Sequence, residues 1–107
     1  MSARSLRVKS LPCLACRLYG VYKQPYPTQE HHLNLGGMAG QKRRGDDYSI
    51  PLCEWHHVGR KHTDIDLEAM TALYGPSLAR QSKKFREVFG KDDDLLKLTD
   101  EQLEIAA

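Results

Sequence analysis

Hydrophobic and polar positions divide the chain into a first part with short apolar segments and a second part with helical spacing. Two short segments, Gln29–Leu35 and Tyr48–Leu52, are candidate β-strands. The glycine-rich stretch 36–45 between them predicts a hairpin with a long loop. A helix is expected to begin at about Cys53, directly after the second strand, and to run past His57.

The second part of the chain predicts three further helices. The first covers Leu67–Tyr74, and the next begins near Pro76, which suits a first helical position, and continues to Phe89. After an acidic turn at 91–94, Thr99–Gln102 has the form of a capping box and predicts a short terminal helix. The hairpin and these helices together predict an α+β fold.

Composition adds a domain organisation to this pattern. Residues 1–10 are basic and contain serine, which predicts a flexible basic arm. Residues 11–107 are expected to form a single domain, in which 11–62 carry the metal motifs and 63–107 form a helical extension. Hydrophobic residues make up 40% of the chain and aromatic residues 7%, so a metal that crosslinks the chain would compensate for a lean core.

The distribution of apolar residues predicts the cellular compartment of the protein. No run approaches the length that a membrane-spanning helix requires, and the first ten residues lack the apolar centre of a signal peptide. We therefore expect a cytoplasmic protein. Cysteines stay reduced there and are available to bind metal.

The three cysteines stand in a zinc-binding pattern. Cys13 and Cys16 are three residues apart, and Cys53 and His56 repeat that spacing, with Cys53 standing 37 residues after Cys16. Two such pairs supply the four ligands of a tetrahedral structural zinc. Buried apolar cysteines are one alternative, and a disulfide is another, although a disulfide would leave one cysteine unpaired. On a helix, His57 points about 100° away from His56 and cannot bind the same ion.

Charge is distributed unevenly between the two parts. Residues 1–62 carry ten Lys or Arg and four Asp or Glu, whereas residues 63–107 carry six and ten. A basic part that also holds the metal motifs suggests a polyanionic partner. A solvated surface with a chance asymmetry explains the same numbers, so charge alone does not choose between them.

Four histidines remain once His56 is assigned to zinc. They are His31, His32, His57 and His62, and all lie in or near the expected hairpin and helix. Three imidazoles can bind a divalent ion, and a fourth can act as a general base because imidazole titrates near neutral pH. For any one of them alone, a histidine with satisfied hydrogen bonds explains the sequence equally well.

These residues carry a resemblance to the HNH nucleases. The matching segments lie within about residues 11–62 and are His31-His32-Leu33, Gly36-Gly37, Asp47 to Cys53, and His56-His57. The resemblance implies a ββα-metal fold, here a small zinc-stapled hairpin and helix with additional C-terminal helices. It further implies that His31 and His57 bind a catalytic Mg²⁺ or another divalent ion and that His32 is the general base.

Within the HNH nucleases, the two strands are similar to those of the phage recombination-enhancement (Ref) proteins, the RecA-dependent nucleases. That similarity implies cleavage of DNA in a bacterial host cell, with a possible partner in a recombinase filament on single-stranded DNA. Five basic residues are expected to contact DNA phosphates: Lys42, Arg43, Arg44, Arg60 and Lys61.

Several points stay open at the level of sequence. His62 is either a third ligand of the catalytic ion or a surface histidine. His32 is oriented either by Glu30 or by a backbone carbonyl. Asp46 or Asp47 stands nearest to the place of the middle Asn of the HNH pattern. A zinc module that binds nucleic acid or protein without chemistry is the alternative function, although such a module needs none of the surplus histidines.

Overall fold

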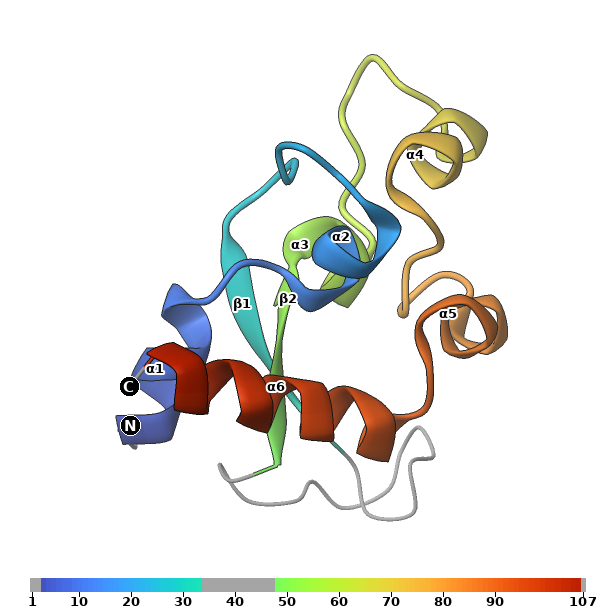
Figure 1. The fold of residues 1–107 in the computed structure, drawn as a ribbon. Helices are drawn as coiled ribbons and strands as arrows, with labels where there is room; N and C mark the ends of the chain where they lie inside the picture. Colours follow the sequence, from blue (N-terminus) through green and yellow to red (C-terminus); the bar gives the residue numbers. More distant parts are fainter. Residues whose placement is uncertain (1–2, 34–47, 107) are drawn as a thin grey trace.

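The computed structural model describes residues 3–33 and 48–106, and the chain has the expected mixed α+β fold (Figure 1). The described elements follow one another as α1 (Ala3–Ser10), α2 (Leu14–Tyr19), β1 (Thr28–His32), β2 (Ser49–Cys53), α3 (Glu54–Val58), α4 (Leu67–Tyr74), α5 (Ser82–Phe89) and α6 (Asp92–Ala106). In Figure 1, α6 runs across the β-hairpin, with α1 at one end of it and α4 and α5 beyond the other.

Strands β1 and β2 form the predicted antiparallel hairpin. Their register pairs Thr28 with Cys53 at one end and His32 with Ser49 at the other. All of β2 is buried, whereas β1 is half-buried along its length. Because successive side chains of a strand point to opposite faces, Gln29 and His31 share one face of β1, and Glu30 and His32 share the other.

The main hydrophobic core lies between the hairpin and the later helices. Its largest fully buried side chains include Trp55 of α3 and Phe85 of α5. The Trp55 indole N–H donates to the carbonyl of Gly75, at a distance of 3.0 Å. Gly75 has φ of +85°, and a Cβ atom there would lie 2.8 Å from the Phe89 ring. Glycine is therefore required at this position both by conformation and by space.

Residues 3–10 form a helix, which corrects the prediction of a flexible basic arm. Val8 of α1 is fully buried and packs with Leu11 and with Leu103 of α6. The guanidinium of Arg4 lies 2.7 Å from a carboxylate oxygen of Asp100 and donates to the carbonyl of Ser49. The basic residues of this segment thus have partners within the fold, and composition alone did not indicate them.

Two of the later helices begin elsewhere than predicted. Helix α4 matches its prediction, but α5 begins at Ser82, several residues after Pro76. Helix α6 begins at Asp92 and continues through Thr99, whose hydroxyl donates to the carbonyl of Leu95 inside the helix. Three aspartates in the first turn of α6 stabilise that earlier start, because they complement the positive end of the helix dipole. No helix in the described part of the chain is long and apolar enough to span a membrane.

Candidate functional site

Cys13, Cys16, Cys53 and His56 converge at one point in the core. All four are buried, and their potential ligand atoms lie within 4.8 Å of one another. Cys13 stands at the N-cap of α2 and Cys16 one turn into that helix, while Cys53 ends β2 and His56 follows in α3. The two pairs predicted from spacing are therefore brought together by the packing of α2 against the hairpin and α3.

The distances within this cluster are those that a zinc ion requires. His56 Nδ1 lies 3.4 Å from the sulfur of Cys13, 3.4 Å from that of Cys53 and 3.6 Å from that of Cys16. The sulfurs of Cys16 and Cys53 are 3.9 Å apart. Tetrahedral zinc with ordinary bond lengths separates two sulfurs by about 3.8 Å and a sulfur from a nitrogen by about 3.6 Å. The cluster is compatible with a structural zinc.

The surroundings of the cluster orient its histidine. His56 Nε2 lies 2.7 Å from the carbonyl oxygen of Tyr74, so the Nε2–H donates there and Nδ1 faces the sulfurs. Burial opposes charge on this ring, yet the sulfurs of Cys13 and Cys53 raise the pKa of His56 to about 9. Hydrogen bonds with Cys13 and Cys16 lower the pKa of the Cys53 thiol. The first shift favours a protonated imidazole and the second a Cys53 thiolate, while hydrogen bonds with Cys13 and Cys53 raise the pKa of Cys16. Zinc binds the deprotonated forms of these groups, so binding of a divalent cation here would release protons.

His57 turns away from this cluster and meets β1. Its ring and that of His31 lie edge to face, with centroids 4.9 Å apart. His57 Nδ1 is 3.0 Å from Oε1 of Gln29, which shares a strand face with His31. The hairpin and α3 thus bring together two of the histidines that the sequence singled out, and Gln29 with them. Sequence analysis missed Gln29, although its position two residues before His31 was a signal.

His32 lies on the opposite face of β1. Its Nε2 is 3.7 Å from a carboxylate oxygen of Glu30. The same oxygen accepts a hydrogen bond of 2.8 Å from the hydroxyl of Ser5 in α1. The sequence left two candidates for orienting His32, Glu30 and a backbone carbonyl. The structure places the Glu30 carboxylate next to the ring. Ser5 was missed at the level of sequence because α1 was predicted as an arm.

His62 is placed with aromatic partners. Its Nδ1 lies 3.1 Å from the hydroxyl of Tyr26, and the two rings are in contact. Gly59 ends α3 with φ of +79°, and the chain then leaves the helix before His62. Among the described residues, the Cys13, Cys16, Cys53 and His56 cluster is the one group of three or more converging His, Cys, Asp or Glu ligands. His31, His57 and His62 do not form a second such group there.

The residues expected to contact DNA are only partly described. Arg60 forms an ion pair of 2.7 Å with Glu54, and its guanidinium lies over the ring of Tyr26. Lys61 donates to the carbonyls of His62 and Ile65. Three others, Lys42, Arg43 and Arg44, lie outside the described residues, as do Asp46 and Asp47.

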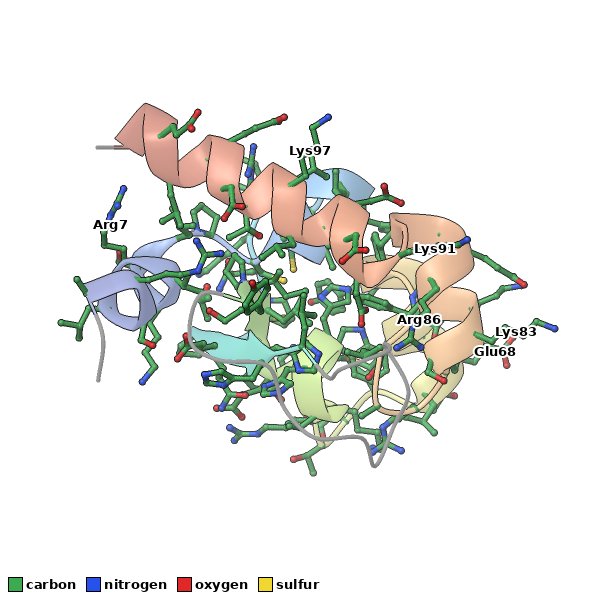
Figure 2. All side chains as sticks on the ribbon, turned by 90° about the horizontal axis from the view of Figure 1, so that it is seen from below. Arg7, Glu68, Lys83, Arg86, Lys91 and Lys97 are labelled. Atoms are coloured by element: carbon green, nitrogen blue, oxygen red, sulfur yellow. The ribbon has the colours of Figure 1, made fainter. Side chains whose placement is uncertain are left out.

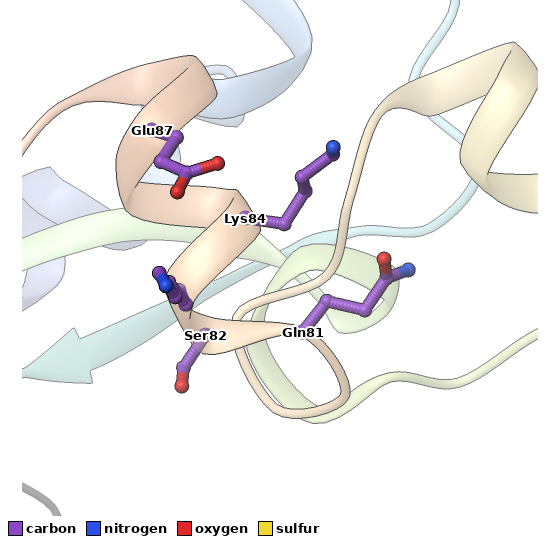
Figure 3. A pocket seen from close by; sticks show the side chains of 5 residues that line it. Gln81, Ser82, Lys84 and Glu87 are labelled. Carbon is purple, nitrogen blue, oxygen red and sulfur yellow. The ribbon is translucent and has the colours of Figure 1, made fainter.

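Other charged and hollow surfaces lie away from the histidines. Figure 2 shows Arg7 of α1, Lys83 of α5, Lys97 of α6 and Lys91, between α5 and α6, projecting outward. A shallow hollow at the start of α5 (Figure 3) is lined by Gln81, Ser82, Lys83, Lys84 and Glu87. Glu87 is the one side chain of this lining with a metal-ligating carboxylate, imidazole or thiol, so the hollow lacks a ligand set for a metal.

Fold and cluster together define a small α+β protein with a Cys₃His site that can hold zinc. The family model described as recombination enhancement, RecA-dependent nuclease, matches residues 3–104. The chain therefore belongs to the family of RecA-dependent nucleases, as the resemblance predicted. The match includes α1, in agreement with its place in the fold. Neither a curated protein nor a solved structure matches the chain.

Proposed function

We propose that this protein is a metal-dependent DNA endonuclease of the HNH type. The observation that carries the proposal is the pairing of His31 and His57, whose ring centroids lie 4.9 Å apart between strand β1 and helix α3. Membership of the RecA-dependent nuclease family supports the activity class. A purely structural zinc domain has no need of two further imidazoles at the junction of hairpin and helix.

His31 and His57 are the proposed ligands of a catalytic divalent ion. Gln29 Oε1 accepts the Nδ1–H of His57 in this arrangement, which leaves the lone pair of that ring on Nε2. His62 is left out of the ligand set because its ring packs against Tyr26. A divalent ion bound here would stabilise the negative charge that develops on the phosphate and on the leaving 3′ oxygen.

His32 is the proposed general base. It removes a proton from the water that attacks the phosphorus atom. His31 and His32 point to opposite faces of β1, so a phosphate must approach the edge of this strand to be reached by both. The hairpin has two strands within the described residues, and β2 occupies the other edge of β1. The outer edge of β1 is thus the proposed place of the scissile phosphate.

The substrate and partner follow from the family and from charge. We propose that the protein cuts DNA next to a recombinase filament on single-stranded DNA. The family description, a RecA-dependent nuclease, supports a dependence on the recombinase. Arg60 and Lys61 follow helix α3 and contribute contacts to DNA phosphates. Such contacts do not depend on the DNA sequence. Binding is therefore expected to be driven by the backbone, to be weakly dependent on sequence and to fall steeply with salt.

A nicking assay on supercoiled plasmid tests the proposal. The zinc-loaded protein is incubated with Mg²⁺, Mn²⁺ or additional Zn²⁺, with and without single-stranded DNA coated by a recombinase. We expect nicking that requires added Mg²⁺ or Mn²⁺ and that rises when the filament is present. The matched control is His57→Ala, which removes a proposed ligand of the catalytic ion and leaves the zinc cluster intact.

The same assay identifies the alternative. A zinc-loaded, folded protein that binds DNA but nicks under none of these conditions would be a non-catalytic zinc module. Strong nicking of naked duplex that the filament does not change would retain the endonuclease activity and remove the dependence on a recombinase.

A further inference from the structure

We infer that Glu30, held in place by Ser5 of helix α1, positions the imidazole of His32. This inference rests on the proposed function, in which His32 is the general base. It assigns to the N-terminal helix a part in the nuclease site, although α1 lies outside the hairpin and helix that bear the proposed ligands.

Three side chains from two elements, Ser5 of α1 and Glu30 and His32 of β1, contact one another in turn. The Ser5 hydroxyl donates to Oε2 of Glu30 at 2.8 Å, and the same oxygen lies 3.7 Å from Nε2 of His32. Glu30 and His32 are two residues apart on β1 and share a face, so their side chains stand next to each other. The second distance exceeds that of a hydrogen bond, and catalytic contacts of this kind often tighten when substrate binds.

The Glu30 carboxylate is more buried than is usual for an acidic side chain. Its side chain is 6% exposed, compared with 18% for that of His32. A carboxylate removed from water is unfavourable unless hydrogen bonds and opposite charge compensate it. Ser5 supplies a hydrogen bond, and the imidazole of His32, 3.7 Å away, is near enough to turn an N–H toward the same oxygen. An acidic side chain with solubility as its sole role would be exposed.

Among the residues that the structure describes, a second charged side chain at this end of the hairpin has other partners. Arg4, one residue before Ser5, donates to the carbonyl of Ser49 and pairs with Asp100 of α6. Ser49 is the cross-strand partner of His32, so Arg4 ties α1 to the hairpin at the level of the proposed base. Arg4 fixes the backbone there, while Ser5 fixes the carboxylate that meets the ring.

The chemical consequence concerns the two nitrogens of the His32 ring. When the Nε2–H donates to Glu30, the lone pair is on Nδ1, and Nδ1 is the atom that accepts the proton of the attacking water. Glu30 also prevents rotation of the ring. It touches neither substrate nor ion in this assignment and is therefore a positioning residue.

A spectroscopic measurement on the full zinc-loaded chain tests the contact without any assay of cleavage. In protein labelled with ¹⁵N-histidine, we expect an Nε2–H signal of His32 that exchanges slowly with water, assigned by its loss in His32→Ala. Glu30→Gln should abolish the slow exchange, because the amide lacks the charge of the carboxylate. A His32 signal that Glu30→Gln leaves unchanged would overturn the inference, whether or not the protein cuts DNA.

A double-mutant cycle then tests the functional role. Glu30→Gln is expected to lower kcat by about 10–100-fold with little change in KM, the usual effect of losing a partner that orients a site residue. In the His32→Ala background, the same substitution should have no further effect, because Glu30 acts through that ring. Equal losses in both backgrounds would overturn the role of Glu30 through His32.

The contribution of α1 has its own matched pair of variants. Ser5→Ala removes the hydroxyl that contacts Glu30, whereas Ser10→Ala removes an exposed hydroxyl of the same helix that donates to the Arg7 carbonyl. We expect Ser5→Ala to lower kcat less than Glu30→Gln does and to speed exchange of the His32 N–H. Ser10→Ala should change neither. Identical behaviour of the two variants would remove α1 from the site, and zinc content and thermal melting verify that each variant is folded.

Discussion

The neighbouring residues His56 and His57 belong to two groups of side chains that differ in burial and in the number of converging ligands. On one side, Cys13, Cys16, Cys53 and His56 are almost entirely buried, and their ligand atoms face one another. On the other, His31 and His57 are half-buried on the hairpin and helix. A closed set of four ligands leaves an ion no open position, whereas two histidines leave positions for water and phosphate. The first arrangement favours stability, and the second favours chemistry.

Helix geometry produces this contrast between neighbouring residues. Side chains one residue apart on a helix are rotated by about 100° from each other. The ring of His56 therefore enters the core and contacts Phe85 and Phe89, while that of His57 meets Gln29 on β1. A single short helix of five residues thus supplies one histidine to each group.

Loss of the zinc cluster should have the largest effect. Cys53→Ser is expected to abolish zinc binding and to unfold the domain, because structural zinc contributes roughly 10–16 kcal/mol in small domains, more than their typical stability. Elemental analysis and far-UV circular dichroism provide the measurement, and chelation of zinc from the unmodified protein should reproduce the result. A folded Cys53→Ser protein would contradict a structural role for the cluster.

Substitution of His56 and His57 tests directly whether these neighbouring histidines have different roles. His56→Ala should lose zinc and lower the melting temperature sharply, since it removes a buried ligand. His57→Ala should keep one zinc per chain and the melting temperature of the unmodified protein while losing binding of the catalytic ion and detectable nicking. Calorimetric titration with Mn²⁺ and thermal melting distinguish the two. Equal destabilisation by both would mean that His57 is as structural as His56.

His32→Ala is expected to have a smaller effect than His57→Ala. It should retain zinc, Mn²⁺ binding and fold, and lower the cleavage rate by about 10²–10⁴-fold, the range typical of a lost general base. Single-turnover cleavage at saturating Mn²⁺ measures this step. A rate near that of the unmodified protein would transfer the role to another residue, of which His31 is the first to examine.

Two glutamines offer the finest test of the difference between the groups. Gln24 accepts a hydrogen bond from the Cys13 N–H and supports the zinc cluster, whereas Gln29 contacts His57. Gln24→Ala should lower the free energy of unfolding by about 1–2 kcal/mol without changing affinity for Mn²⁺. Gln29→Ala should weaken Mn²⁺ binding by about 10–100-fold at unchanged stability. Reversed effects would show that the assignments of the two glutamines are wrong.

The parts of the molecule that depend on local spacing could be predicted from sequence. Pairs of ligands three residues apart predict a zinc cluster, and the geometry of Cys13, Cys16, Cys53 and His56 is compatible with one. The hairpin was also predicted, because two short segments flank a glycine-rich stretch, and α3 was predicted to begin directly after the second segment. The resemblance to the RecA-dependent nucleases depended on the same local motifs, and the family match confirms that part of it.

The parts that depend on distant contacts could not be predicted. Helix α1 is stabilised by Asp100 and Leu103, nearly the whole chain away, and nothing in residues 3–10 alone indicates those partners. Side-chain alternation along β1 could have placed Gln29 beside His31, but the partner on α3 is a tertiary fact. The starts of α5 and α6 differ from those predicted by Pro76 and by the capping-box pattern at Thr99, because tertiary packing outweighs such local signals.

The pairing of α1 with α6 has a consequence for the order in which the site is completed during protein synthesis. The side chain of Arg7 donates to the carbonyl of Leu103, so α1 reaches this partner only after α6 has been made. At ordinary translation rates, that delay is roughly 5–20 s. Until then Ser5 lacks the support that packs α1 against the hairpin, and Glu30 is not held. A chain still on the ribosome can therefore bind zinc before it can position its proposed base, which would delay nuclease activity until α6 has been made.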